Sequence, residues 1–76
     1  MKENNPTKLN EIIAERIKEL RKEKGLNQIE SAKLLNIDKS TIAKYETGTT
    51  VPSVNMLVAL AKFFDVPAGY ILGLED

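Results

Sequence analysis

The first third of the chain repeats apolar residues at helical spacing. Four apolar side chains follow one another at intervals of four, four and three residues: Leu9, Ile13, Ile17 and Leu20. This spacing places them along one face of a helix. Pro6 precedes the segment and Gly25 follows it, which is the usual order of start and stop residues. We therefore predict a first helix over residues 7–24.

Capping residues delimit two shorter helices in the middle of the chain. Asn27 and Glu30 have the spacing of a capping box, and Asn36 stands where a left-handed residue would end the second helix. Asp38 is the predicted N-cap of a third helix. The apolar surface of the second helix is expected from three residues: Ala32, Leu34 and Leu35. Two short helices joined by a turn of about three residues are typical of a helix-turn-helix.

The C-terminal part of the chain predicts two further helices. Pro52 and Ser53 precede a segment that ends at Phe64, and Ser53 has the residue type of an N-cap. The expected inner face of this fourth helix consists of Val54, Leu57, Leu60, Ala61 and Phe64. A short fifth helix is predicted over residues 67–72. Because no segment alternates apolar and polar residues as a half-buried strand would, we predict an all-α fold of five helices.

The third predicted helix has two different sides. At about 100° per residue, one side carries Thr41, Ile42, Tyr45 and Glu46. The other side is small or basic: Lys39, Ser40, Ala43, Lys44 and Thr47. Such a side suits the major groove of DNA, where lysine reaches guanine acceptors or phosphates and alanine contacts a thymine methyl group. Two lysines on a short helix can equally be ordinary surface residues, and this helix alone does not distinguish the two interpretations.

Glu46 falls on the inner side of the third helix, and a buried carboxylate needs a cationic partner. Arg21 is the best candidate, because it directly follows the apolar residue Leu20 at the end of the first helix. The spacing leaves open the alternative that Glu46 lies at the surface without such a partner.

The composition limits the possible classes of function. The 76 residues include no cysteine and no histidine, so a disulfide framework and a thiolate metal site are excluded. The serine and threonine hydroxyls also lack the usual catalytic partners. We therefore expect no enzyme activity, no metal site and no cofactor. The length suits one domain over residues 1–76, with a flexible N-terminal arm over residues 1–6 and a tail over residues 74–76.

The formal net charge is zero, from 11 basic and 11 acidic residues, whereas a DNA-binding domain is usually basic. The basic residues are unevenly distributed, since residues 1–24 hold seven basic and five acidic residues and residues 51–76 hold one basic and three acidic residues. No apolar run is long enough to span a membrane, and the first residues do not form a signal peptide. We expect a soluble, cytoplasmic protein that does not associate with membranes.

The ordered set of features over residues 13–73 resembles the helix-turn-helix domains of phage repressors and Cro proteins, and of Xre-type bacterial regulators. The residues that carry the resemblance are Arg21, Gly25-Leu26, Gln28, Ala32, Leu35, Ser40-Thr41-Ile42, Tyr45-Glu46, Gly48, Pro52-Ser53, Leu57, Leu60-Ala61 and Tyr70-Ile71-Leu72-Gly73. The resemblance implies a lambda-repressor-like domain of five helices. Its second and third helices would form the helix-turn-helix, and the third would lie in the major groove.

The resemblance also implies roles for individual residues. Arg21 and Glu46 are implied to form an ion pair between the first and third helices. Gln28 is implied to contact a phosphate and to brace the start of the third helix. The base-contacting positions of the family are matched by Lys39, Ser40 and Lys44, and its backbone-contacting positions by Asn27, Thr47 and Thr49.

Two departures from the family pattern affect these expectations. Ser31 stands where the family usually has leucine, so we expect looser packing around the second helix. Thr49, Thr50 and Val51 replace a loop that often carries lysine. We therefore expect weaker neutralisation of DNA phosphates by this loop.

Together these features favour a sequence-specific regulator of transcription that binds double-stranded DNA. It would act as a repressor and as a homodimer on a palindromic operator. The expected dimer interface consists of apolar groups near the C-terminus: Phe63, Tyr70 and Leu74. The alternative is a protein-interaction module of the same fold, such as an antitoxin-like or anti-repressor partner. The zero net charge and the expected exposure of Ile29 and Phe63 favour that alternative.

Overall fold

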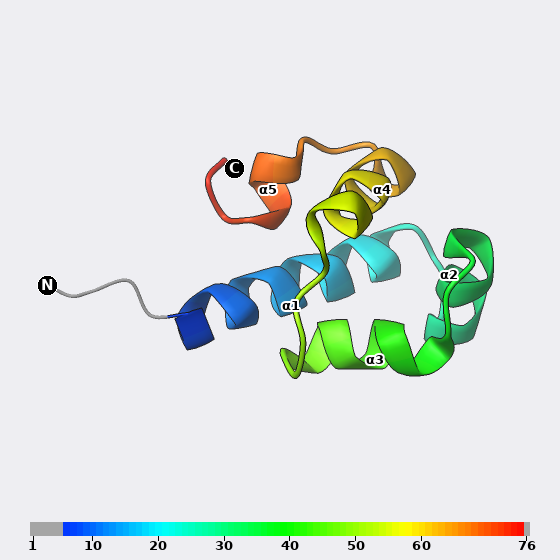
Figure 1. The fold of residues 1–76 in the computed structure, drawn as a ribbon. Helices are drawn as coiled ribbons and strands as arrows, with labels where there is room; N and C mark the ends of the chain where they lie inside the picture. Colours follow the sequence, from blue (N-terminus) through cyan, green and yellow to red (C-terminus); the bar gives the residue numbers. More distant parts are fainter. Residues whose placement is uncertain (1–5, 76) are drawn as a thin grey trace, which may run out of the picture.

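The computed structural model describes residues 6–75 and contains five helices in the predicted order (Figure 1). They are α1 (Pro6–Glu23), α2 (Gln28–Leu35), α3 (Lys39–Thr47), α4 (Val54–Phe64) and α5 (Ala68–Ile71). The described residues include no β-strand, and the prediction of an all-α fold with a helix-turn-helix at α2 and α3 is confirmed.

The predicted N-terminal arm, apart from Pro6 at the start of α1, lies outside the described residues, as does Asp76 of the predicted tail. Within residues 6–75, no helix combines the length and the apolar character needed to cross a lipid bilayer.

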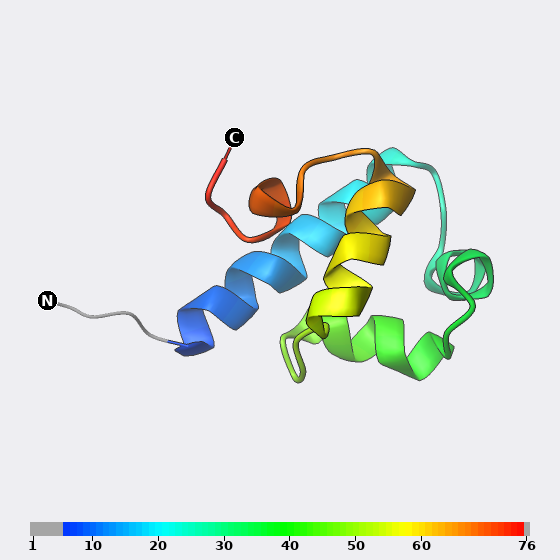
Figure 2. The ribbon, with the colours of Figure 1, turned by 45° about the horizontal axis from the view of Figure 1, so that its top comes forward.

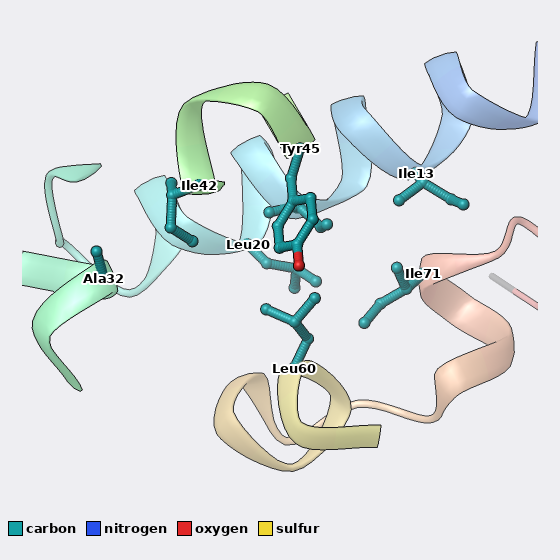
Figure 3. Packing of buried hydrophobic residues seen from close by; sticks show 8 residues of the cluster. Ile13, Leu20, Ala32, Ile42, Tyr45, Leu60 and Ile71 are labelled. Atoms are coloured by element: carbon teal, nitrogen blue, oxygen red, sulfur yellow. The ribbon is translucent and has the colours of Figure 1, made fainter. Parts of the chain in front are cut away.

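The long helix α1 is the centre of the fold. It packs against α3 on one side and against α5 on another, while α2 contacts both α3 and α4 (Figures 1 and 2). Side chains from all five helices meet in the core, which consists of Ile13, Ile17, Leu20, Ala32, Ile42, Tyr45, Leu60 and Ile71 (Figure 3). Two of these residues, Ile42 and Tyr45, come from α3, so the inner side of the third helix is anchored in the core.

The helix ends follow the predicted capping residues with one exception. Asn27 and Glu30 form the capping box of α2, and Asn36 ends that helix in the left-handed conformation, with φ 60°. Ser53 caps α4 by accepting a hydrogen bond from the amide of Met56. Asp38 occupies the N-cap position of α3, but its side chain makes no cap hydrogen bond. The first-turn amides of α3 are therefore not used by a side-chain cap.

Three residues of the predicted apolar faces are exposed, the first being Leu9 of α1 at 42%. Leu34 is 63% exposed, because the inner face of α2 is formed by Ser31, Ala32 and Leu35, and Leu34 falls outside it. Val54 is 78% exposed, because it lies about 120° around α4 from the buried Leu60. All three residues expose apolar side chains that the sequence placed on apolar faces.

Ser31 is completely buried in α2, and its hydroxyl has no hydrogen-bond partner among the described residues. A buried hydroxyl without a partner is destabilising by roughly 1–3 kcal/mol. We expect Ser31→Ala to stabilise the protein by about 1 kcal/mol and to raise its melting temperature by roughly 4–8 °C. The matched control is Ser40→Ala, which replaces an exposed helical serine. A melting temperature lowered by Ser31→Ala would show that the hydroxyl has a stabilising partner.

Candidate nucleic-acid interface

The two sides of α3 differ in burial as the sequence predicts. Ile42 and Tyr45 are buried, and the side chain of Glu46 is only 3% exposed. The opposite side is accessible, with Ala43 partly exposed and four residues exposed: Lys39, Ser40, Lys44 and Thr47. The structure therefore brings all five residues of the predicted outward side together on one accessible surface. We refer to Lys39, Ser40, Ala43, Lys44 and Thr47 as the outward surface of α3.

The outward surface of α3 carries two positive charges and no carboxylate. Glu46, the acidic residue within α3, points to the interior, and Asp38 lies at the N-cap, just before the helix. Near Lys39, the uncapped first-turn amides add the positive end of the helix dipole. This combination attracts anions to one end of the surface.

Three side chains hold α3 in a fixed position relative to α1 and α2. Arg21 Nε donates a hydrogen bond to Glu46 Oε2 at 2.6 Å, and Arg21 Nη2 donates to Glu46 Oε1 at 2.9 Å. Gln28 Nε2 donates to the same Oε1 at 3.1 Å. Arg21 also donates through Nη1 to the carbonyl of Leu26 at 2.9 Å. Both charged groups of this network are thus well satisfied by hydrogen bonds.

The Arg21–Glu46 pair is largely removed from solvent, with 11% of the arginine side chain exposed. The hydrogen bond to Glu46 raises the pKa of the Arg21 guanidinium above its ordinary range, and this effect outweighs the lowering caused by burial. The hydrogen bond to Glu46 therefore favours the charged form of Arg21. The ion pair joins the end of α1 to the end of α3.

The family resemblance implied that Gln28 braces the start of α3, but its side chain makes a different contact. Its amide instead reaches Glu46, in the last turn of the helix. The reason is geometric, because Arg21 already draws the Glu46 carboxylate toward the α1–α2 turn, where Gln28 begins α2. Gln28 nevertheless remains partly exposed at the N-terminus of α2.

The remaining predicted backbone-contacting residues lie at the surface but already make internal hydrogen bonds. Asn27 accepts from the amide of Glu30 as the α2 cap. Thr47 donates to the carbonyl of Lys44 at 3.2 Å, and the hydroxyls of Thr47 and Thr49 are 2.8 Å apart. Because Thr47 uses its proton on Lys44, Thr49 is the donor in the threonine pair. Each hydroxyl must leave one of these bonds to donate to a phosphate.

The predicted dimer residues do not share one exposed surface. Phe63 packs edge-on against Phe64, with the Lys24 ammonium 5.2 Å from its ring centroid. The guanidinium carbon of Arg16 lies over the ring of Tyr70, 4.2 Å from the ring centroid. Leu74 is 79% exposed. Tyr70 therefore contacts the middle of α1, whereas Phe63 contacts Lys24, the residue that directly follows that helix.

Sequence reasoning missed two residues of α1 that position neighbouring segments. Asn10 Nδ2 donates to the carbonyl of Gly48 at 3.5 Å, at the end of α3. Arg16 donates to the carbonyls of Tyr70 and Glu75, which holds the C-terminal segment against α1. Both are polar residues on a helix rich in surface charges, so only their side-chain contacts distinguish them.

Tyr45 makes the stability of the fold depend on pH in the alkaline range. Burial raises the pKa of its phenol above the ordinary value of 10.0, so the unfolded chain loses this proton first as the pH rises. The resulting stabilisation is complete below about pH 10 and is lost as the pH rises through the folded-state pKa. We expect the melting temperature of Tyr45→Phe to fall less than that of the wild type between about pH 9 and about pH 11.

The control for this titration is Tyr70→Phe, which removes the other tyrosine and keeps Tyr45. Its melting temperature should follow the wild-type profile over the same pH range. Parallel profiles for Tyr45→Phe and the wild type would contradict the role assigned to the buried phenol.

Comparison with known proteins identifies the family of this chain. The profile of the helix-turn-helix family matches residues 17–71. The HTH-type transcriptional regulator AnsR of Bacillus subtilis is 44% identical over 61 residues, which is 80% of this chain and 53% of AnsR. The transcriptional repressor RstR of the cryptic phage CTXphi from Vibrio cholerae is 39% identical over 56 residues, 74% of this chain and 50% of RstR.

A further relative, the uncharacterized HTH-type transcriptional regulator YobD of Bacillus subtilis, is 39% identical over 65 residues, 86% of this chain and 58% of YobD. The chain thus spans about half the length of the curated relatives it matches. With the family profile covering most of its residues, the chain belongs to the helix-turn-helix family of transcriptional regulators that includes phage repressors and Xre-type proteins.

Proposed function

We propose that this protein is a sequence-specific transcriptional regulator that binds double-stranded DNA, with α3 in the major groove. The observation that carries the proposal is the outward surface of α3, which is small, basic and free of carboxylates. The inner side of α3 is held in place by the core and by the Arg21–Glu46 pair. A rigid helix with short side chains approaches base edges closely, and membership of a regulator family supports this function over catalysis.

The proposed contacts fall into two groups. Lys39 and Lys44 reach guanine acceptors or nearby phosphates, Ser40 bonds a base edge, and Ala43 contacts a thymine methyl group. The second group positions the helix by contacting the sugar–phosphate backbone: Asn27, Gln28, Thr47 and Thr49. The internal bonds of the two threonines make their phosphate contacts the weaker ones. Sequence preference therefore depends mainly on the first group.

We further infer that the protein acts as a homodimeric repressor on a palindromic operator. One short helix reads only a few base pairs, and two copies related by a twofold axis read two half-sites about 34 Å apart. Similarity to the phage repressor RstR supports repression by occupancy of the operator.

A second candidate function, a protein-interaction module, has two observations in its favour. Ile29 at the start of α2 is largely exposed, and the antitoxin PezA of Streptococcus pneumoniae is 34% identical over 65 residues. The dependence of DNA affinity on salt separates the two functions. A protein that binds through phosphates loses affinity linearly in a log–log plot as salt is raised, whereas an interaction module retains no duplex even at low salt.

Selection of bound duplexes from a random pool tests the proposed function directly. We expect enrichment of one motif with two inverted half-sites whose centres lie about one helical turn apart. A pool that shows no enriched motif after several rounds at low salt would contradict sequence-specific binding.

A further inference from the structure

The loop that follows α3 uses its backbone donors inside the protein. The carbonyl of Lys44, in the last turn of α3, accepts hydrogen bonds from the amides of three loop residues: Gly48, Thr49 at 3.0 Å and Thr50 at 3.4 Å. The hydroxyl of Thr47 donates to the same carbonyl at 3.2 Å. Each of the three amides is thus bonded within the protein and is not available to a DNA phosphate.

The hydroxyl groups of Thr47 and Thr49, which we call the threonine pair, also have both of their protons in use. Thr47 donates to the carbonyl of Lys44, and Thr49 donates to the oxygen of Thr47, 2.8 Å away. A threonine oxygen has two lone pairs, so one stays open on Thr47 and two stay open on Thr49. Both residues are exposed. The threonine pair therefore presents acceptors to the solvent and keeps its donors inside.

The electrostatics at this end of α3 also favour a neutral donor over a phosphate. Thr47 is the last residue of α3, where the end of the helix dipole is negative. Lys44 supplies the positive charge of this turn, and the loop over residues 48–53 adds none. A phosphate oxygen is an acceptor, as the open positions of the threonine pair are, so the two repel each other. A neutral N–H group is attracted by both the open lone pairs and the dipole.

Contacts with α1 hold the backbone of the threonine pair in place. Gly48 ends α3 in the left-handed conformation, with φ 78°. Its carbonyl accepts a hydrogen bond from Asn10 of α1. A Cβ atom at Gly48 would lie 3.6 Å from the carbonyl oxygen of Asn10 and 3.9 Å from the Cβ atom of Ala14. The end of α3 is therefore packed directly on α1, which fixes the threonine pair relative to the outward surface of α3.

We propose that Thr47 determines specificity at one base, because its oxygen accepts a hydrogen bond from an exocyclic amino group of adenine or cytosine. These amino groups are the hydrogen-bond donors that bases present in the major groove. The inference rests on the proposed function, in which the outward surface of α3, including Thr47, enters that groove. It gives Thr47 a base contact in place of the phosphate contact proposed above.

The amino group is the partner that costs the protein least. Thr47 can accept from an amino group while both internal bonds of the threonine pair stay intact, whereas donation to a phosphate breaks one of them. Thr49 is a positioning residue in this contact. Its proton occupies one lone pair of Thr47, which leaves a single lone pair for the base.

A double-mutant cycle between the full chain and the selected operator tests this contact. Each adenine of the operator is replaced in turn by purine, which lacks the 6-amino group, and each cytosine by 2-pyrimidinone, which lacks the 4-amino group. Thr47→Val removes the hydroxyl and keeps the shape of the side chain. Comparison of both proteins on both duplexes separates the contact with Thr47 from the weaker base pairing that the analogue itself causes.

We expect Thr47→Val to weaken binding to the natural operator by roughly fivefold or more, as the loss of a base contact does. One analogue in each half-site should weaken binding of the wild type to a similar extent. On that duplex Thr47→Val and the wild type should bind equally well. The effective analogue, purine or 2-pyrimidinone, then shows whether the base is adenine or cytosine.

Two further variants serve as controls. Thr47→Ser keeps the hydroxyl and should stay sensitive to the same analogue. Thr50→Val removes a hydroxyl from an exposed threonine of the loop, outside the outward surface of α3, and should keep wild-type affinity. Thermal unfolding followed by circular dichroism shows that each variant is folded.

Replacement of single phosphates by uncharged methylphosphonates tests the competing partner. Thr47→Val should weaken binding by the same factor with and without each replacement. The proposal is overturned if the effect of Thr47→Val depends on no base analogue, if it depends on a methylphosphonate instead, or if this variant binds the natural operator as tightly as the wild type. Failure of the wild type to bind any duplex at low salt would refute the proposed function itself, and this contact with it.

Discussion

Glu46→Ala is expected to destabilise the protein by about 3 kcal/mol, with a melting temperature lowered by more than about 10 °C. Removing one partner of a buried ion pair costs roughly 3–5 kcal/mol, because the other charge stays buried. The lower end applies here, since Arg21 keeps its bond to the carbonyl of Leu26 and 11% of its side chain is exposed. Thermal and urea unfolding followed by circular dichroism measure the change.

This loss is large for a domain of 76 residues, whose total stability is expected to be about 4–11 kcal/mol. The variant should therefore keep only about 1–8 kcal/mol of stability, and at the lower end a substantial fraction of it is unfolded. The matched control is Glu23→Ala, at an exposed acid at the end of α1, which should change stability by less than about 0.5 kcal/mol. An unchanged melting temperature in Glu46→Ala would mean that the ion pair does not hold α3 in place.

The second large effect is expected on DNA binding. Lys39→Ala/Lys44→Ala should weaken binding to the selected operator by roughly 100-fold or more, because each specific contact contributes about 1–3 kcal/mol. Both residues are exposed, so the melting temperature should stay close to that of the wild type. The slope of affinity against salt should also decrease, since fewer counterions are released. Fluorescence anisotropy of a labelled operator at several salt concentrations measures both quantities.

Lys22→Ala is the matched control for the two lysines. Lys22 is an exposed cation on α1 that belongs to neither group of proposed contacts. Its replacement should leave operator affinity within about twofold of the wild type. If Lys22→Ala loses as much affinity as the double variant, binding reflects a general attraction between basic residues and DNA phosphates, and α3 does not read the operator sequence.

Most of the fold follows from local patterns that the sequence displays. The capping box at Asn27 and Glu30, the left-handed Asn36 and the Ser53 cap each fix a helix end through interactions within a few residues. The inward position of Glu46 follows from helical periodicity. Its pairing with Arg21 requires contact between two helices, and the two residues are 25 positions apart in the chain. The position of Arg21 made it the best candidate partner, but spacing left the pairing open, and the family resemblance implied it.

The errors arise where tertiary contacts decide. The sequence placed Leu9, Leu34 and Val54 on apolar faces, but the directions from which neighbouring helices approach leave all three exposed. Gln28 was expected to act on the start of α3, and its amide instead follows the Glu46 carboxylate. Phe63 and Tyr70 were expected to be available for dimerisation, and the cations Lys24 and Arg16 lie over the two rings. None of these contacts can be inferred from the spacing of residues along the chain.

The central claim is that the outward surface of α3 enters the major groove of DNA. Titration of the ¹⁵N-labelled protein with the selected operator, followed by two-dimensional NMR, tests it most directly. The account predicts that the largest shifts, together with intermolecular contacts to base protons, occur at Lys39, Ser40, Ala43 and Lys44. Binding that leaves these four residues unperturbed, and shifts residues of another helix instead, would contradict the account.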